Sequence, residues 1–337
     1  MSVPISVIIP TYNRANLLIR CLDLVVNQTL EPSEVIIVDD GSTDNTKEII
    51  DRYKNRIKGL RYIYQNNQGE SCARNKGLIN ARYSYIAFLD SDDEWLPNHL
   101  EEAIKAFSIY QQVGLVYSAY NIIDQSNGLS ELAIQKKKER MQYATKIAIK
   151  NDSIYYLLEP KRFLVDMLRS KIAVLPSTMV LNRDNMPKTF FFDELLPFGP
   201  DIDFIFKLLF TNIWCCYINS SHTNYYIHSS NIILTDSCKT LNKRLSSLLN
   251  TLPTNEKRLL YCSNLEEYDL VLTNLSDLYW MIAGMLDDLG KYDEAKKWYQ
   301  LSFRLLPRLG TGKHLLVYKF LGIKGKKFLK KIIGRRG

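Results

Sequence analysis

The sequence lacks several features that would assign it to common classes of protein. Its 337 residues include six cysteines but no Cys-x-x-Cys pair, so a disulfide scaffold is not expected. No basic-then-apolar leader opens the chain, and no apolar run reaches the roughly 18–20 residues that span a bilayer. Neither phosphate loop, G-x-x-x-x-G-K-[ST] or G-x-G-x-x-G, follows the first apolar run, which argues against an NTPase and a dinucleotide dehydrogenase. We expect a cytoplasmic protein with reduced thiols.

The distribution of charge argues against a nucleic-acid-binding protein. The chain carries a net charge of +8, but ten basic and no acidic residues lie from Arg308 onward. Removing those ten charges leaves −2 on residues 1–307, so the basic character belongs to the tail. Lysines alternate there with apolar residues at helical spacing, a pattern typical of helices that bind membrane surfaces. Residues 313–337 are predicted to bind an anionic membrane surface, with a solvated terminus as the alternative.

Short, nearly continuous apolar runs recur in the first 120 residues and alternate with stretches of helical periodicity. The runs are Ser6–Ile9, Val35–Val38, Arg61–Tyr64, Tyr85–Leu89 and Leu115–Tyr117. Such runs are typical of strands buried on both faces. Helices are expected at about 16–28, 43–53, 71–81 and 97–111, with Ser42 or Thr43 and Ser71 as N-caps. The alternation predicts a doubly wound, mostly parallel α/β sheet with helices on both faces.

The pattern changes beyond residue 120. Residues 124–152 are polar and predict an inserted loop or a solvated helix. A strand at Ser177–Leu181, a helix at Asp201–Phe210 and a strand at Cys215–Ile218 follow, and everything beyond residue 236 has helical periodicity. Tyr279–Pro307 resembles a single tetratricopeptide unit. The sequence thus predicts an α/β domain over 1–235 and a helical region over 236–337.

Three polar clusters directly follow predicted strands. They are Pro10–Arg14, Asp39–Asp44 and Asp90–Asp93. Ligands of doubly wound sheets bind beyond the carboxyl ends of the strands, so two Asp-rich ends at that edge indicate a site. Close carboxylates repel one another unless a cation compensates them, and oxygen ligands such as Asp90 and Asp92 suit Mg²⁺ or Mn²⁺. Arg74 is the nearest basic residue that could hold phosphates.

Four motifs occur in order on these strand ends and helix starts. They are Ser6–Arg14 (SVIIPTYNR), Val38–Asp44 (VDDGSTD), Gly69–Asn75 (GESCARN) and Phe88–Asp93 (FLDSDD). Together they resemble glycosyltransferase family 2, whose members are nucleotide-sugar transferases with the GT-A fold. The resemblance is strong over about residues 3–120 and looser over 170–235. It implies a GT-A catalytic domain over 1–235.

The resemblance also implies which residues bind the nucleotide-sugar donor. Thr11, Tyr12 and Asp39 match positions that hold the nucleoside, commonly uridine, and Asp40 lies beside them. The other donor-binding candidates are Pro10, Arg14, Arg74, Asp90 and Ser91.

The metal and the catalytic base are assigned in the same way. Asp90 and Asp92 match an Asp-x-Asp motif whose last aspartate carries a divalent metal, Mg²⁺ or Mn²⁺, and whose first faces the ribose. Family members carry a Gly-Glu-Asp segment whose aspartate is the base. Here Pro200 replaces the glutamate and Asp201 remains, with a helix N-terminal charge as its alternative role. His228 could approach the phosphates or the metal, or could be structural.

The resemblance implies a metal-dependent, inverting glycosyltransferase of the hexosyltransferase type. It would transfer a sugar from a nucleotide-diphosphate donor, expected to be a UDP-sugar, to a glycan or lipid-linked glycan in surface polysaccharide synthesis. We expect it in the cytoplasm, peripheral to the inner face of the plasma membrane. One alternative is a sugar nucleotidyltransferase, although Pro10–Arg14 is not a Gly- and basic-rich loop. The other is a helical-repeat scaffold with a degenerate nucleotide-binding domain, which the Asp90 and Asp92 pair disfavours.

Overall fold

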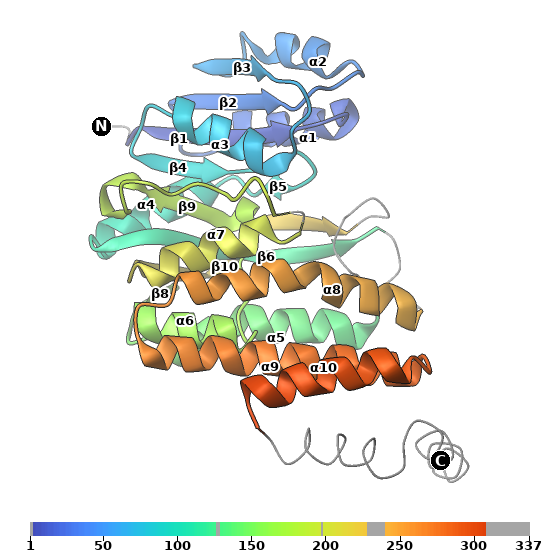
Figure 1. Ribbon diagram of the computed structural model, residues 1–337. Coiled ribbons are helices and arrows are strands. Elements are labelled where there is room, and N and C mark those ends of the chain that lie inside the picture. The colour runs from blue at the N-terminus through green and yellow to red at the C-terminus, as the bar shows by residue number, and fades with distance from the viewer. Residues whose placement is uncertain (1–2, 126–128, 197, 228–239, 308–337) are drawn as a thin grey trace. The chain divides into compact units, whose positions relative to one another are not determined.

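The computed structural model describes residues 3–125, 129–196, 198–227 and 240–307 (Figure 1). The chain divides into two compact units, Met1–Ile232 and Ile233–Gly337. The boundary predicted after residue 235 falls among residues 228–239, outside the described ranges, so it stays a prediction. Each unit is considered by itself below.

The N-terminal half of the first unit is a parallel sheet. Its strands are β1 (Ile5–Thr11), β2 (Glu34–Asp39), β3 (Leu60–Tyr64) and β4 (Tyr85–Phe88). They lie in the order β3-β2-β1-β4, and the register places Thr11 beside Asp39 and Asp39 beside Tyr64. The carboxyl ends of three strands are therefore adjacent, as the site predicted at this edge requires.

The second half of the sheet mixes both strand directions. Its strands are β5 (Glu94–Trp95), β6 (Val113–Asp124), β7 (Lys150–Asp152), β8 (Tyr155–Leu158), β9 (Met179–Asn182) and β10 (Trp214–Ile227). β9 pairs antiparallel with both β4 and β6, whereas β6 and β10 are parallel. All ten strands form one sheet. The predicted α/β class is confirmed, with an antiparallel component that short apolar runs do not reveal.

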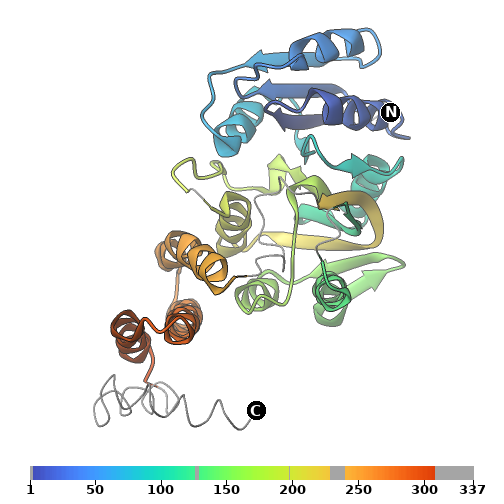
Figure 2. The same ribbon diagram turned by 90° about the vertical axis from the view of Figure 1, so that its right-hand side faces the viewer.

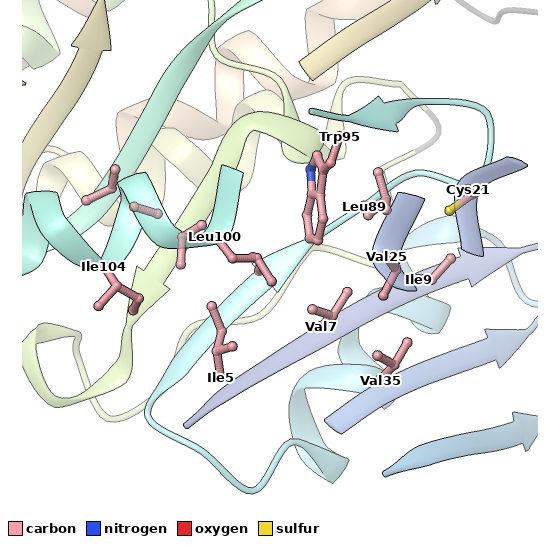
Figure 3. Close-up of a cluster of buried hydrophobic side chains, with 14 of the residues drawn as sticks. Ile5, Val7, Ile9, Cys21, Val25, Val35, Leu89, Trp95, Leu100 and Ile104 are labelled. Atoms are coloured by element: carbon pink, nitrogen blue, oxygen red, sulfur yellow. The ribbon is translucent and has the colours of Figure 1, made fainter. Parts of the chain in front are cut away.

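Helices α1 (Ala15–Val26), α2 (Thr46–Tyr53) and α4 (His99–Ile109) cover one face of the sheet. Ile5, Val7 and Ile9 point to this face because alternate residues of a strand share a side. Figure 3 shows them packed with Cys21 and Trp95, both of them buried. The cluster forms the core on this face of the sheet.

Helices α3 (Glu70–Asn80) and α7 (Pro200–Phe210) belong to the opposite face. A Cβ atom on Gly77 would lie 2.3 Å from Cγ2 of Ile8, so a glycine is needed for α3 to approach β1 this closely. The rings of Phe88 on β4 and Phe204 on α7 lie 6.2 Å apart. In Figure 2, α1 (dark blue) and α3 (light blue) lie on opposite sides of the N-terminal strands.

The remaining helices of this unit are α5 (Glu131–Ile147), α6 (Pro160–Leu168) and the short 3₁₀ turns η1 (Pro176–Thr178) and η2 (Arg183–Asn185). Of the two structures predicted for residues 124–152, the solvated helix is the one that forms as α5. Its Ala133, Met141 and Ala144 are buried, while Lys136 and Lys138 are exposed.

Two predicted helix starts are wrong. α2 begins at Thr46, and its N-cap is Asn45 rather than Ser42 or Thr43. The carboxylate of Asp44 binds the Thr46 amide at 3.1 Å and so takes over the capping contact. α3 begins at Glu70 after Gly69, whose φ of +94° favours glycine, and this places Ser71 inside the helix.

The second unit is helical, as predicted. It contains α8 (Leu241–Lys257), the short turn η3 (Arg258–Leu260), α9 (Leu265–Asp288) and α10 (Tyr292–Leu305). Gly290, with φ of +76°, lies in the turn between α9 and α10, and Ile282, Ala295 and Tyr299 pack between these two helices. This pair corresponds to the predicted tetratricopeptide-like unit. The basic tail, 313–337, lies outside the described residues.

No helix in the described ranges combines the length and the apolar character needed to cross a membrane.

Candidate functional site

The loops that follow β1 and β2 are tied together by Asn13. Its backbone N–H donates to Oγ of Ser42 at 2.9 Å, and its side-chain oxygen accepts from the N–H of Thr43 at 2.8 Å. Asn13 has φ of +51°, a left-handed conformation that asparagine adopts more readily than most residues. The first two predicted clusters therefore form one connected surface.

Asp44 fixes the starts of two helices at this surface. One carboxylate oxygen accepts from the N–H of Ala15 at 3.1 Å, and the other accepts from the N–H and the hydroxyl of Thr46 at 3.1 and 2.6 Å. Burial opposes ionisation, but these hydrogen bonds outweigh it and lower the pKa of Asp44 below its ordinary value. The ionised carboxylate also suits the positive ends of both helix dipoles.

A cavity of about 430 Å³ opens beside Asp39. Its lining residues are Asp39, Ser42, Asp44, Lys47, Tyr62 and Tyr64. The carboxylate of Asp39 accepts from the N–H of Ser42 at 2.8 Å and from the Tyr62 hydroxyl at 2.7 Å. Burial and the Asp39 charge raise the pKa of Tyr62, which stays a neutral donor. The cavity is therefore lined by both aromatic rings and carboxylates.

Sequence reasoning missed the part of this cavity that β3 contributes. Tyr62 and Tyr64 lie on β3, and Tyr64 is about half exposed. Their relevance depends on β3 being the neighbour of β2, which the strand order of the sheet decides. The sequence signal that could have indicated these residues is the pair of tyrosines at the end of the predicted strand. Of the predicted residues nearby, Tyr12 is half exposed, whereas Pro10 and Thr11 are buried.

Asp40 anchors the loop that leads into α3. Its carboxylate accepts from the side chain of Gln65 at 2.8 Å and from the N–H groups of Gln68 and Gly69 at 2.9 and 2.8 Å. Asp40 is buried, and these three bonds occupy its oxygens. The residue predicted beside the nucleoside thus positions Glu70, the first residue of the helix.

Arg74 lies at the centre of a charged cluster. Its side chain is 2% exposed, and Nη2 donates to Glu70 at 2.5 Å and to Asp90 at 2.6 Å. Its guanidinium also lies 5.3 Å from the ring centroid of Phe192. The ring of Phe192 in turn stacks on Phe204 of α7 at 4.1 Å.

Asp201 belongs to the same cluster. It is the second residue of α7 and lies one turn before Phe204, so the two side chains share a helix face. Burial raises the pKa of Asp201 above its ordinary value, an effect that nearby Arg74 opposes and Glu70 reinforces. For Arg74, burial disfavours the charged form, but Asp90 and Glu70 outweigh it and raise its pKa. A carboxylate with a raised pKa suits a general base.

The end of β4 is held by Ser177 of η1, another residue that the sequence did not single out. Its hydroxyl donates to buried Asp93 at 2.6 Å and accepts from the N–H of Asp90 at 3.1 Å. Burial, with Asp90 and Asp92 adding like charge, raises the pKa of Asp93. Ser91 is buried. Ser177 precedes β9, the antiparallel neighbour of β4, so its position depends on strand order.

The predicted metal ligands each face an arginine. Arg74 contacts Asp90, and Arg14 forms an ion pair with Asp92. Within the described ranges, no three His, Cys, Asp or Glu side chains form a group that could hold a metal ion. A Mg²⁺ site built from one or two carboxylates and substrate phosphates needs fewer protein ligands, and Asp92 and Asp90 fit that arrangement. In this structure the Asp92 carboxylate is paired with Arg14, which a metal ion bound there would have to displace.

The structure therefore brings most of the predicted residues to one edge of the sheet. Asp39, Asp90 and Asp92 lie at or just beyond strand ends, Arg74 binds Asp90, and Asp201 is near enough for its charge to act on Arg74. His228 lies outside the described residues. A parallel sheet with carboxylates at its strand ends and a cavity beside them is typical of α/β proteins that bind a ligand at this edge.

Comparison with models of protein families finds a match in the first unit. Residues 6–161 match the model of the family described as "Glycosyl transferase family 2". This segment, which is similar to the family, contains β1 to β8 and all three acidic or polar strand ends. The family resemblance of the motifs is thereby confirmed. Helix α7, with Asp201, lies beyond the matched residues.

Individual relatives match over part of their length. Glycosyltransferase GlyA of Streptococcus pneumoniae serotype 4 is 37% identical over 125 residues, which cover 37% of this chain and 18% of that protein. Glycosyltransferase GlyG of the same organism is 35% identical over 158 residues, which cover 42% of this chain and 50% of GlyG. The chain thus covers half or less of these two relatives, so their whole-protein activities do not transfer to it directly.

Solved structures share the fold over nearly the whole chain. S. aureus TarS 1–349 in complex with UDP-GlcNAc has a TM-score of 0.55 at 18% identity and covers 94% of this chain and 91% of its own. Mannosyltransferase PcManGT from Pyrobaculum calidifontis, in complex with GDP-Man and Mn²⁺, has a TM-score of 0.57 at 15% identity, covering 97% and 83%. At these identities the likeness concerns the fold, which confirms the expected GT-A type.

Proposed function

We propose that the protein transfers a sugar from a nucleotide-diphosphate donor to a hydroxyl group of a glycan or lipid-linked glycan. The observation that carries this proposal is the cluster in which Arg74 joins Asp90 at the end of β4 to Glu70, with Asp201 of α7 near enough to raise the pKa of Arg74 by its charge. The match of residues 6–161 to the family supports the reaction class, and the neighbours bound to UDP-GlcNAc and GDP-Man support the donor class.

The donor would occupy the edge formed by β1, β2 and β4. We assign the nucleoside to the cavity beside Asp39, where Tyr62 and Tyr64 offer aromatic surface to a base. The diphosphate would lie toward Asp90 and Asp92. A divalent ion, Mg²⁺ or Mn²⁺, held there by Asp92 and Asp90 would supply positive charge beside the leaving diphosphate.

Asp201 would act as the general base in a single displacement. Its carboxylate takes the proton of the acceptor hydroxyl while that oxygen bonds to the anomeric carbon. The bond from that carbon to the diphosphate oxygen breaks, and the nucleoside diphosphate leaves with the electron pair. Attack opposite the leaving group inverts the anomeric centre. The raised pKa of Asp201 supports this assignment.

The acceptor and the location are proposals from sequence. A role in surface polysaccharide synthesis at the inner face of the plasma membrane would bring lipid-linked glycans to the site. Residues 313–337 would then bind the anionic membrane surface. The nucleotidyltransferase and scaffold alternatives are less well supported, because the matched family and the arrangement of carboxylates both favour transfer of a sugar.

Substituting the metal ligand tests the proposal. A panel of UDP- and GDP-sugars is incubated with the purified protein and Mn²⁺, and release of the nucleoside diphosphate is measured. The wild type should turn over at least one donor, and EDTA should stop it. Asp92→Ala should lower the rate at least about hundredfold, because an interaction with developing charge is lost. Asp277→Ala in α9, in the second unit, is the matched control. Turnover by Asp92→Ala at the wild-type rate would remove Asp92 from the site.

A further inference from the structure

Glu70 is the charged residue of this cluster that the sequence analysis did not assign. It is the first residue of α3, and its position is set by Gly69, whose N–H binds Asp40 at 2.8 Å. Its side chain is 50% exposed, whereas that of its partner Arg74, 2.5 Å away, is 2% exposed. Glu70 therefore forms the solvent-facing side of the cluster and Arg74 its buried side.

Arg74 retains unused hydrogen-bond donors at this point. Nη2 serves both Glu70 and Asp90, while Nε and Nη1 are buried and have no partner among the residues that the structure describes. A buried N–H without a partner is unfavourable, because it loses its hydrogen bond to water and gains none in return. Donors left open in this way, inside a site that would hold a substrate, point to a ligand that supplies acceptor atoms.

The charge of the cluster restricts what that ligand can be. With Asp90 and Asp92 facing the proposed divalent ion, Glu70 and Asp201 contribute two carboxylates against the single guanidinium of Arg74. A further carboxylate placed here would be repelled. A hydroxyl group is not repelled, and it can accept from Arg74 and donate to Glu70 at the same time.

We propose that Glu70 and Arg74 bind hydroxyl groups of the transferred sugar and restrict the donor to neutral sugars, excluding uronic acids. The inference rests on the proposed function, because a sugar lying between the diphosphate near Asp90 and the base Asp201 would border this pair. Glu70 is then a specificity-determining residue: its charge faces the sugar, and its oxygens accept hydrogen bonds from the sugar's hydroxyl groups.

The test compares donors that differ only in the oxidation of C6. The protein with Mn²⁺ receives UDP-glucose or UDP-glucuronate, and in parallel GDP-mannose or GDP-mannuronate, and kcat/KM is measured for each. For the pair that it uses, the wild type should have a kcat/KM at least about tenfold higher with the neutral sugar than with the uronate. Repulsion between the Glu70 carboxylate and the uronate carboxylate, a few ångströms apart, accounts for this difference. Glu70→Gln should lower the ratio of kcat/KM for the neutral sugar to kcat/KM for the uronate by about tenfold. Glu70→Asp, which keeps the charge, should leave this ratio unchanged. Glu131→Gln, at the exposed first position of α5, is the matched control.

Each result decides between named outcomes. Equal or better use of the uronate by the wild type overturns the inference and leaves the proposed function intact, whatever the variants do. An unchanged preference in a folded Glu70→Gln protein also overturns it. Failure of the folded wild type to bind any donor of the UDP- and GDP-sugar panel, measured by calorimetry, rejects the proposed function and the inference together.

Discussion

At the scale of single residues, Arg74 organises the site in a way that its motif did not reveal. The sequence predicts a basic group that contacts the donor, and such groups are usually exposed. In the structure Arg74 is buried and joins α3 to the end of β4 through Asp90, while Phe192 links it to α7. The same side chain can therefore hold the site together and present its remaining N–H groups to a ligand.

Ser177 offers a residue-scale prediction. Ser177→Ala removes the hydroxyl that donates to buried Asp93 and accepts from the N–H of Asp90. A buried carboxylate that loses its hydrogen-bond donor should lower the free energy of unfolding by about 1–3 kcal/mol. Urea unfolding followed by circular dichroism measures the change. Ser108→Ala, an exposed helical serine that bonds only to its own helix, should change stability by less than about 0.5 kcal/mol. Equal losses of stability in the two variants would contradict the stabilising role assigned to the Ser177 hydrogen bonds.

At the scale of elements, the helix starts near the site depend on one carboxylate. Asp44 accepts from the first turns of both α1 and α2. Asp44→Ala should cost about 1 kcal/mol of stability, as the loss of an N-cap does. Because Asp44 is exposed, solvent screens any additional contribution of its charge.

The effect of Asp44 should depend on pH. Its pKa is lower in the folded state than in the unfolded state, so the carboxylate stabilises the fold above the unfolded value of about 3.9. This contribution is lost as the pH falls through the lower folded value. The stability difference between the wild type and Asp44→Ala should therefore be full at pH 7 and smaller at pH 3, as urea unfolding at both values would measure. A difference that grows at pH 3 would contradict this account.

The sequence predicted the parallel half of the sheet well, for a physical reason. β1, β2 and β4 are buried on both faces, so each appears as a continuous apolar run, and polar residues begin where burial ends. The predicted and observed ends of these strands differ by no more than two residues. The acidic clusters could therefore be placed at the correct edge from the order of residues alone.

The remaining features of the site could not be predicted because they depend on which elements become neighbours. Tyr62, Ser177 and Phe192 reach the site from β3, η1 and the segment before α7. Nothing in their local sequence states that β3 lies beside β2 or that β9 pairs with β4. The helix starts were predicted wrongly for another reason. Local propensity favours the serines and the threonine as N-caps, but Asp44 makes the capping contact of α2 and Gly69 precedes the first residue of α3.

At the scale of the whole molecule, the site draws on two stretches of the first unit that are far apart in sequence. The segment that matches the family ends at residue 161, yet α7 contributes Asp201. The matched segment supplies the donor-side carboxylates, and the later segment would supply the base. If this division is correct, substitutions in the two stretches should affect different steps of the reaction.

Separating donor binding from transfer in Asp201→Asn tests the proposed mechanism most directly. Calorimetry should give this variant a dissociation constant for the donor within about threefold of the wild type, because the carboxylates of the donor side are intact. Its transfer rate should fall at least about hundredfold, the lower limit for losing a general base. Asp184→Asn, an exposed aspartate of η2, should change neither quantity. Transfer by Asp201→Asn at the wild-type rate would contradict the mechanism.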